Sequence, residues 1–280
     1  ANADASSASV SNEITLGDAN ITSLRIPGLQ SGASDGSVLT YNSSNGNITL
    51  AAGGLTNNAA HAGSLGVGST ALDSETSGSD NTAFGVNAGT AITTGYDNTL
   101  VGHDAGDSIT TGGSNTFIGY RVGGEVTDTN GSTAVGAAAC RDLTTGSNNT
   151  AVGRLALAQT TTGGNNTAVG ISTLTSNTTG TQNTAIGTNA GTSQTTASEN
   201  TLIGAYAGDA LTTGQGNVAL GRASLTSATT PNNNVAVGVD AMEQTTTGAG
   251  NVTVGNYALQ DNTTGGNNVA IGYFAGHEKL

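Results

Sequence analysis

Few residues of this sequence are of the types that perform chemistry, and none stands at a spacing that chemistry needs. The three histidines, His61, His103 and His277, lie far apart in the chain, whereas a metal site or a nucleophile–base pair needs such side chains in a local pattern. The single cysteine, Cys140, cannot form a disulfide within its own chain, and we interpret it as a small buried apolar residue. The sequence therefore predicts no catalytic residue, no metal ligand and no cofactor, and it favours a protein that is not an enzyme.

The elements that must position every side chain are the units of a strict internal repeat. A core of the form Asn-[Thr/Val]-x-[Val/Ile/Leu/Phe]-Gly recurs with a 17-residue period, without insertion or deletion. Stacked coils tolerate no change in length, unlike surface loops. The period predicts an all-β parallel β-solenoid, or β-roll, of about 13 coils, roughly 60 Å long at about 4.8 Å per coil. The units begin at Ser64, Asn81, Asn98, Asn115, Ser132, Asn149, Asn166, Asn183, Asn200, Asn217, Asn234, Asn251 and Asn268.

The composition agrees with a fibrous rod rather than a globule. The chain has 44 Gly, 2 Pro, no Trp, 3% aromatic residues and 9% charged residues, which is too few large apolar side chains for a conventional core. Disordered chains are also poor in such residues, but they are usually highly charged and lack phased aliphatic positions. We therefore expect an ordered, repetitive structure.

Numbering each unit from its Asn as position 1 separates columns with different expected roles. Position 5 is always Gly, which predicts a positive φ or a close backbone approach. Position 4 is always Val, Ile, Leu or Phe, and we expect it to point into the coil. Position 3, mostly Ala, would then point outward, because neighbouring strand residues face opposite sides. A second chain covering position 3 would explain its apolar character, so the pattern predicts a homo-oligomer.

Two further columns indicate a packed interior. Where position 9 is Gly, position 12 is usually aliphatic, and where position 9 is Leu or Met, position 12 is small or polar. This compensation predicts that the two positions share one slot, because both voids and overfilling cost stability. Gly191 with Gln194 breaks the rule, as does Gly276 with Lys279, and we expect those coils to be looser. The Asn residues at position 1 are expected to stack in a side-chain ladder, and Thr-Thr-Gly at positions 13 to 15 to turn the chain.

The chain divides into three segments by composition. Residues 1–12 are rich in Ala, Ser and Asn and are expected to be flexible. Residues 13–63 form a small β connector or attachment module, in which two alternating runs within 36–50, separated by Asn45-Gly46, predict a β-hairpin. Residues 64–280 form the rod. The sequence holds no apolar run that predicts a signal segment or membrane insertion.

Charge and motif spacing exclude two binding functions and weaken a third. A net charge of −13 argues against binding of nucleic acid through its phosphates. Calcium-binding β-roll repeats need an Asp at fixed phase in every turn, and here Asp73, Asp107 and Asp209 recur only sporadically. Ice binding is a third hypothesis, but Thr-Thr-Gly predicts one outward Thr rank per coil, whereas a flat ice-binding face would prefer two.

Positions 6 and 7 hold most of the scarce aromatic and basic side chains. Exposed Tyr and Arg are typical of binding surfaces, although single exposed side chains spread over many coils also occur without function. The candidate recognition face consists of Tyr120, Arg121, Arg154, Tyr206, Arg222, Tyr257, Tyr273 and Phe274.

The repeat also resembles known families. Ala151-Val152-Gly153 followed by Ala156 is similar to the A-[VI]-G-x-x-[AS] head repeats of trimeric autotransporter adhesins. The full unit N-T-A-V-G-x-x-A-L-x-x-x-T-T-G more closely resembles arrays of phage tail-fibre proteins, and the G-x-V-L-T-Y-N segment that starts at Gly36 resembles connectors of phage structural proteins.

The resemblance implies an extracellular, homotrimeric fibre on a virion surface. Its N-terminal end would join other fibre or virion proteins, and its partner would be a cell-surface glycan or protein receptor. A secreted or cell-surface bacterial adhesin of the trimeric autotransporter type is the alternative, and an ice-binding solenoid is the third.

Overall fold

The computed structural model describes residues 38–42, 47–51 and 63–277. Strands β1 (Val38–Asn42) and β2 (Asn47–Ala51) pair antiparallel, with Val38 opposite Ala51 and Asn42 opposite Asn47. This confirms the hairpin predicted within 36–50, whereas its turn at Asn45-Gly46 lies outside the described residues. The predicted flexible segment 1–12, most of the connector 13–63 and Lys279 lie outside them as well.

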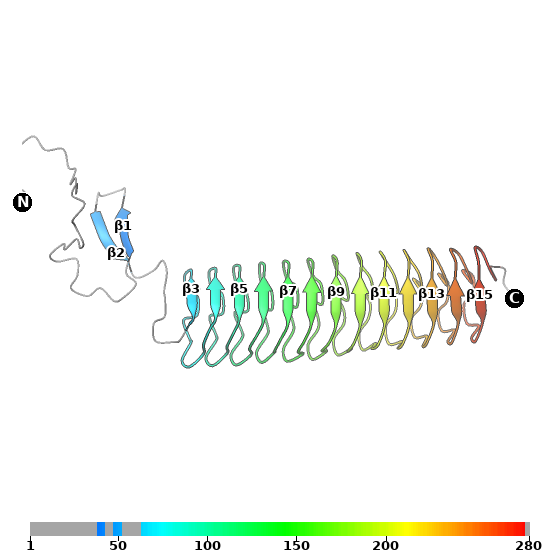
Figure 1. The fold of residues 1–280 in the computed structure, drawn as a ribbon, viewed down its shortest axis with the longest axis horizontal. Helices are drawn as coiled ribbons and strands as arrows, with labels where there is room; N and C mark the ends of the chain where they lie inside the picture. The colour runs from blue at the N-terminus through cyan, green and yellow to red at the C-terminus, as the bar shows by residue number, and fades with distance from the viewer. Residues whose placement is uncertain (1–37, 43–46, 52–62, 278–280) are drawn as a thin grey trace, which may run out of the picture.

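The rod is a β-solenoid whose coils repeat with the predicted 17-residue period (Figure 1). Each coil contributes a strand of three residues, and the strands form one 13-stranded parallel sheet in chain order. Every strand pairs in register with the equivalent strand of the neighbouring coil, as Thr167, Thr184 and Thr201 illustrate. The strands are β3 (Leu65–Val67), β4 (Thr82–Phe84), β5 (Thr99–Val101), β6 (Thr116–Ile118), β7 (Thr133–Val135), β8 (Thr150–Val152), β9 (Thr167–Val169), β10 (Thr184–Ile186), β11 (Thr201–Ile203), β12 (Val218–Leu220), β13 (Val235–Val237), β14 (Val252–Val254) and β15 (Val269–Ile271).

The glycine at position 5 meets both requirements expected of it. Gly136 has a φ of 134°, and a Cβ added there would lie 2.7 Å from the carbonyl oxygen of Gly153 in the next coil. A side chain would therefore push adjacent coils apart. Positions 7, 9 and 17 are also left-handed throughout the described coils, even in non-glycine residues such as Leu155, with a φ of 60°, and Leu157, with a φ of 52°. These four corners bend the chain into a closed coil.

The prediction that position 4 points into the coil and position 3 points outward is wrong. The position 3 residues, such as Ala151, are buried inside their own coil, whereas position 4 residues point outward: the exposed fraction of Val152 is 38% and that of Phe84 is 59%. The expected alternation holds, but its phase is inverted. Positions 8, 9 and 12 also point inward, so the coil has room for a large side chain at position 3 only where a neighbouring inward position is small.

The shared slot between positions 9 and 12 is confirmed, and position 3 is its third member. A Cβ added to Gly89 would lie 3.0 Å from Cδ1 of Ile92 in its own coil, 2.7 Å from Cδ1 of Leu100 in the next coil and 3.0 Å from Cδ2 of Leu72 in the previous one. The three large residues at position 3, Leu100, Phe117 and Leu202, all lie in coils whose position 9 is Gly. Three columns therefore share one volume.

The predicted asparagine ladder runs through the buried corner at position 1. The side-chain Oδ1 of Asn149 accepts hydrogen bonds from the backbone N–H of Asn166, at 3.0 Å, and from its Nδ2, at 3.2 Å. The same Nδ2 donates to the carbonyl of Gly180 at 2.9 Å. At the first described coil, where Ser64 replaces Asn, Oε1 of buried Glu75 accepts from Nδ2 of Asn81 at 2.7 Å. Each amide thereby ties its coil to the one before it.

We expect Asn166→Ala to lower the free energy of unfolding by about 2–4 kcal/mol, because it leaves the buried backbone N–H of Asn183 without its acceptor and removes the Nδ2 donor to the carbonyl of Gly180. Urea unfolding followed by circular dichroism measures the change. Thr162→Ala, on an exposed side chain of the preceding unit, is the matched control. An equal loss in both variants would contradict the ladder's role.

We expect Gln194→Leu to raise the free energy of unfolding by about 1–3 kcal/mol. Gln194 is fully buried, and neither Oε1 nor Nε2 of its amide has a partner among the described residues. The reverse change, Leu211→Gln in another coil with Gly at position 9, should destabilise. Thermal unfolding of both variants tests this, and a destabilised Gln194→Leu would show that the amide is satisfied in solution.

Candidate interaction surface

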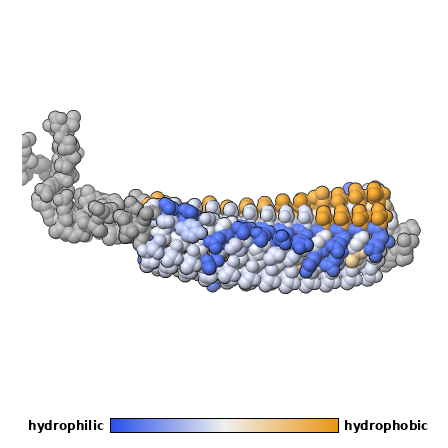
Figure 2. Space-filling view, turned by 60° about the horizontal axis from the view of Figure 1, so that its bottom comes forward, coloured by the Kyte–Doolittle hydropathy of each residue, from blue (hydrophilic) through white to orange (hydrophobic). Residues whose placement is uncertain are grey.

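The outward face of the long sheet is an uncharged, largely apolar strip. Positions 2 and 4 of every strand point to this side, and position 4 is aliphatic or Phe in all thirteen strands. No strand residue from β3 to β15 carries a charge, although the whole chain has 19 acidic and 6 basic residues. Figure 2 shows the apolar side chains as a row along the rod. A single chain therefore leaves a continuous apolar row accessible to solvent.

This face changes character toward its C-terminal end. Position 2 is Thr from β4 to β11 and Val from β12 to β15. The apolar row accordingly widens at that end in Figure 2. In β15 the exposed fractions of Val269 and Ile271 are 72% and 70%. Two kinds of surface thus lie on one sheet: Thr beside an aliphatic or Phe side chain over the eight strands β4 to β11, and wholly aliphatic over the four strands β12 to β15 and over the first strand, β3.

Threonines form a second regular column on another side of the rod. The hydroxyl of Thr161, at position 13, donates to the carbonyl of Thr178 in the next coil at 3.1 Å, and the same bond recurs along the rod. Thr162, at position 14, is exposed. Since the position 13 hydroxyls are already bonded, most coils offer one Thr hydroxyl here, at position 14, without a partner among the described residues; Ser77 and Asp128 replace this Thr in two coils.

The candidate recognition residues are not brought together into one site. Tyr257, Tyr273 and Phe274 do form a cluster: the rings of Tyr257 and Phe274 stack with centroids 4.8 Å apart, and Tyr273 meets Phe274 edge-on at 4.5 Å. His277, which the sequence did not single out for this face, contacts Phe274 at 4.7 Å. Far along the rod, Tyr120 lies 5.8 Å from the ring of His103.

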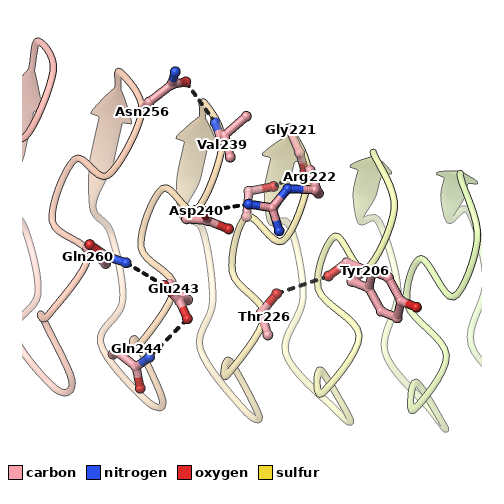
Figure 3. Close-up of polar contacts among 11 residues, drawn as sticks. Tyr206, Gly221, Arg222, Thr226, Val239, Asp240, Glu243, Gln244, Asn256 and Gln260 are labelled. Atoms are coloured by element: carbon pink, nitrogen blue, oxygen red, sulfur yellow. Dashed lines mark hydrogen bonds and ion pairs between the residues drawn. The ribbon is translucent and has the colours of Figure 1, made fainter.

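The basic members of this face also differ in their surroundings. Arg222 forms an ion pair with Asp240 of the next coil, with 2.7 Å between Nη2 and Oδ2 (Figure 3). The carboxylate of Asp240 therefore partly neutralises the charge of Arg222. Nearby, the hydroxyl of Thr226 donates to the carbonyl of Tyr206 at 3.1 Å. Arg121 and Arg154 make no ion pair within residues 63–277, and they lie two coils apart. The face is a series of small contacts rather than a pocket.

The histidine, cysteine and carboxylate side chains of the described rod are the other groups capable of chemistry. Within 63–277, no three His, Cys, Asp or Glu side chains are grouped so as to hold a metal ion. Cys140 is fully buried, and burial raises the pKa of its thiol to about 12. The reactive species is the thiolate, which therefore hardly forms at neutral pH.

Two carboxylates at position 10 are held in an unfavourable setting. Burial raises the pKa of Asp107 above its ordinary value of 3.8, and the nearby Asp104 raises it further, although Arg121 and the backbone partly offset this. Burial also raises the pKa of Asp209. In both residues Oδ1 is buried without a hydrogen-bond partner among the described residues. The ionised form of each is therefore less stable in the folded protein than in the unfolded chain.

We expect Asp107→Asn and Asp209→Asn to stabilise the rod slightly at pH 7. A folded-state pKa above the unfolded value means that ionisation destabilises the folded state, so stability rises as the pH falls through the folded pKa. The gain from Asn should shrink on acidification and disappear below about pH 3.8. Melting temperatures of the wild type and both variants between pH 3 and 7 measure this. A gain that stays constant over this range would contradict it.

Comparison with protein-family models, with curated proteins and with solved structures finds no match. Among the described residues, no helix is long and apolar enough to cross a membrane.

Proposed function

We propose that this chain is the rod of a homotrimeric fibre that gives reach and attachment to a surface, as part of a phage tail fibre. The observation that carries the proposal is the uncharged aliphatic column at position 4, exposed along the full sheet of a single chain. Exposed apolar strips of this extent mark contacts with other molecules. Position 4, and not the buried position 3, is therefore the column available for contact between chains.

The regular spacing of this strip and its lack of charge favour a copy of the same chain as its partner. Thirteen coils at about 4.8 Å, with a face about 10 Å wide, give on the order of 600 Å², against about 800 Å² per partner in stable interfaces. A copy repeats with the same spacing between coils, so its side chains stay in step over the whole length. Because each chain carries −13, two copies repel except where a face is free of charge.

The remaining parts of the proposal rest on the sequence resemblance. We propose that the N-terminal end joins other fibre or virion proteins, outside the cell, and that the exposed aromatic and basic side chains of positions 6 and 7 contact a cell-surface glycan or protein. The cluster of Tyr257, Tyr273 and Phe274 is the strongest candidate for this contact. A bacterial adhesin filament built on the same coil would use the rod in the same way.

Ice binding is the second candidate, and one observation favours it. From β4 to β11 the outward face presents a Thr and an aliphatic or Phe side chain on every strand, in register. This supplies a regular two-rank face that the Thr-Thr-Gly column lacks. Since one face cannot be both covered by copies of the chain and open to ice, the two functions exclude each other on this surface.

We expect sedimentation equilibrium of the full chain to give about three times 27.1 kDa, with the frictional ratio of a rod. Val152→Lys with Val169→Lys should yield a folded monomer, because charges in a dry contact are costly. Thr162→Lys with Thr179→Lys, on the Thr column, should leave the trimer intact. A monomeric wild type would contradict the fibre, and thermal hysteresis of that monomer would favour ice binding.

A further inference from the structure

We propose that the four C-terminal strands, β12 to β15, form the strongest contact between copies of this chain, and that the contact weakens toward β4. This inference rests on the trimer proposed above. It concerns where along the rod the chains hold one another, which the existence of a trimer does not specify.

The outward side chains of these four strands are all aliphatic. Position 2 supplies a Val in each, and position 4 supplies Leu, Val, Val and Ile in turn. All eight are partly or largely exposed in the single chain. The residues are Val218, Leu220, Val235, Val237, Val252, Val254, Val269 and Ile271.

The eight strands before them carry a hydroxyl at each position 2. The Oγ1 atoms of these threonines, from Thr82 to Thr201, make no hydrogen bond to any group in the described part of the chain. They are therefore free to bind water. A partner chain that covers them must remove that water or trap it, and a buried hydroxyl without a partner opposes association. Val has nearly the same shape and carries no such cost.

Folding of the coil does not account for the change from Thr to Val. Both residues are β-branched and favour strands. The strands on either side of the change, β11 and β12, have the same length and pair in the same register as the rest. Position 3 stays buried in both. The substitution therefore alters only the outward surface, which is where a partner would sense it.

The area of the aliphatic face of β12 to β15 limits how much it contributes to association. Four coils give roughly 200 Å² of face, which is far below the about 800 Å² per partner of a stable interface. The patch does not hold chains together on its own. It is the end of a longer contact at which water is most completely excluded. When the chains dissociate, they separate first along the threonine-bearing strands β4 to β11.

The test is a pair of matched quadruple variants, studied by sedimentation over a dilution series. Val218→Thr, Val235→Thr, Val252→Thr and Val269→Thr together should raise the concentration at which the trimer dissociates by at least about a hundredfold. Thr133→Val, Thr150→Val, Thr167→Val and Thr184→Val together should lower it. Circular dichroism of both variants checks that the solenoid is retained.

Each outcome separates the two proposals. A wild type that stays monomeric at every concentration overturns the trimer, and this inference with it. A trimeric wild type whose dissociation is unchanged in both variants overturns only the assignment to β12 to β15. If the Val→Thr variant fails to fold, the Thr→Val variant decides: tighter association supports the inference, and unchanged association overturns it.

Discussion

The close contact between the backbones of successive coils at position 5 is the constraint on which this structure depends. The Cα of Gly136 faces the carbonyl of Gly153 so closely that no side chain fits between them. Every coil must therefore repeat the backbone path of its neighbour, since one added residue would misplace this corner and every hydrogen bond after it. The parallel sheet and the asparagine ladder run in step with that contact. Stiffness along the rod follows, because bending it means distorting several such columns together.

A small interior follows from the same repeat. Each short coil encloses so little volume that positions 3, 9 and 12 share one slot, and a large residue in one column requires a small one in another. Leu100 and Ile92 fill the space that a side chain at Gly89 would take. Gln194 is the exception: it shares the space beside Gly191 with Leu174 and Leu202, and its amide is buried without partners among the described residues. With the interior this full, the aliphatic residues of position 4 are left on the outside.

The period, the glycine corner, the asparagine ladder, the shared slot and the hairpin were all predictable from the sequence, because each is marked by residue types that recur, compensate or alternate at fixed spacing. The sequence did not predict which of positions 3 and 4 points inward. Alternation along a strand requires that neighbouring residues point to opposite sides, but it does not specify which of them faces the interior. Both columns are apolar, so hydrophobicity could not decide. Side-chain size could have decided it. Leu100, Phe117 and Leu202 each occur in a coil with Gly at position 9, which indicates that position 3 shares the interior volume of positions 9 and 12. The left-handed corners at positions 7 and 9 were only partly signalled: Gly89 at position 9 and Asn87 at position 7 favour a positive φ, whereas Leu155 and Leu157, at the same positions of another coil, rarely adopt it.

The candidate surface was predictable only in part for a related reason. Positions 6 and 7 do collect exposed aromatic and basic residues, but the coils that carry them are spread along the rod, and only Tyr257, Tyr273 and Phe274 meet. The uncharged strip could not be recognised as a surface from the sequence, because its position 4 column is as apolar as a core column. The proposed fibre depends on this strip joining the chains.

Oxidative cross-linking of Val152→Cys probes this contact, because buried Cys140 gives little background. If three chains meet in register on this face, a mild oxidant in dilute solution should link about two of every three chains into a covalent dimer and leave the third unlinked. Thr162→Cys, on another side of the rod, should remain unlinked. A Val152→Cys chain that stays monomeric on a non-reducing gel, at concentrations where the wild type sediments as an oligomer, would contradict the account.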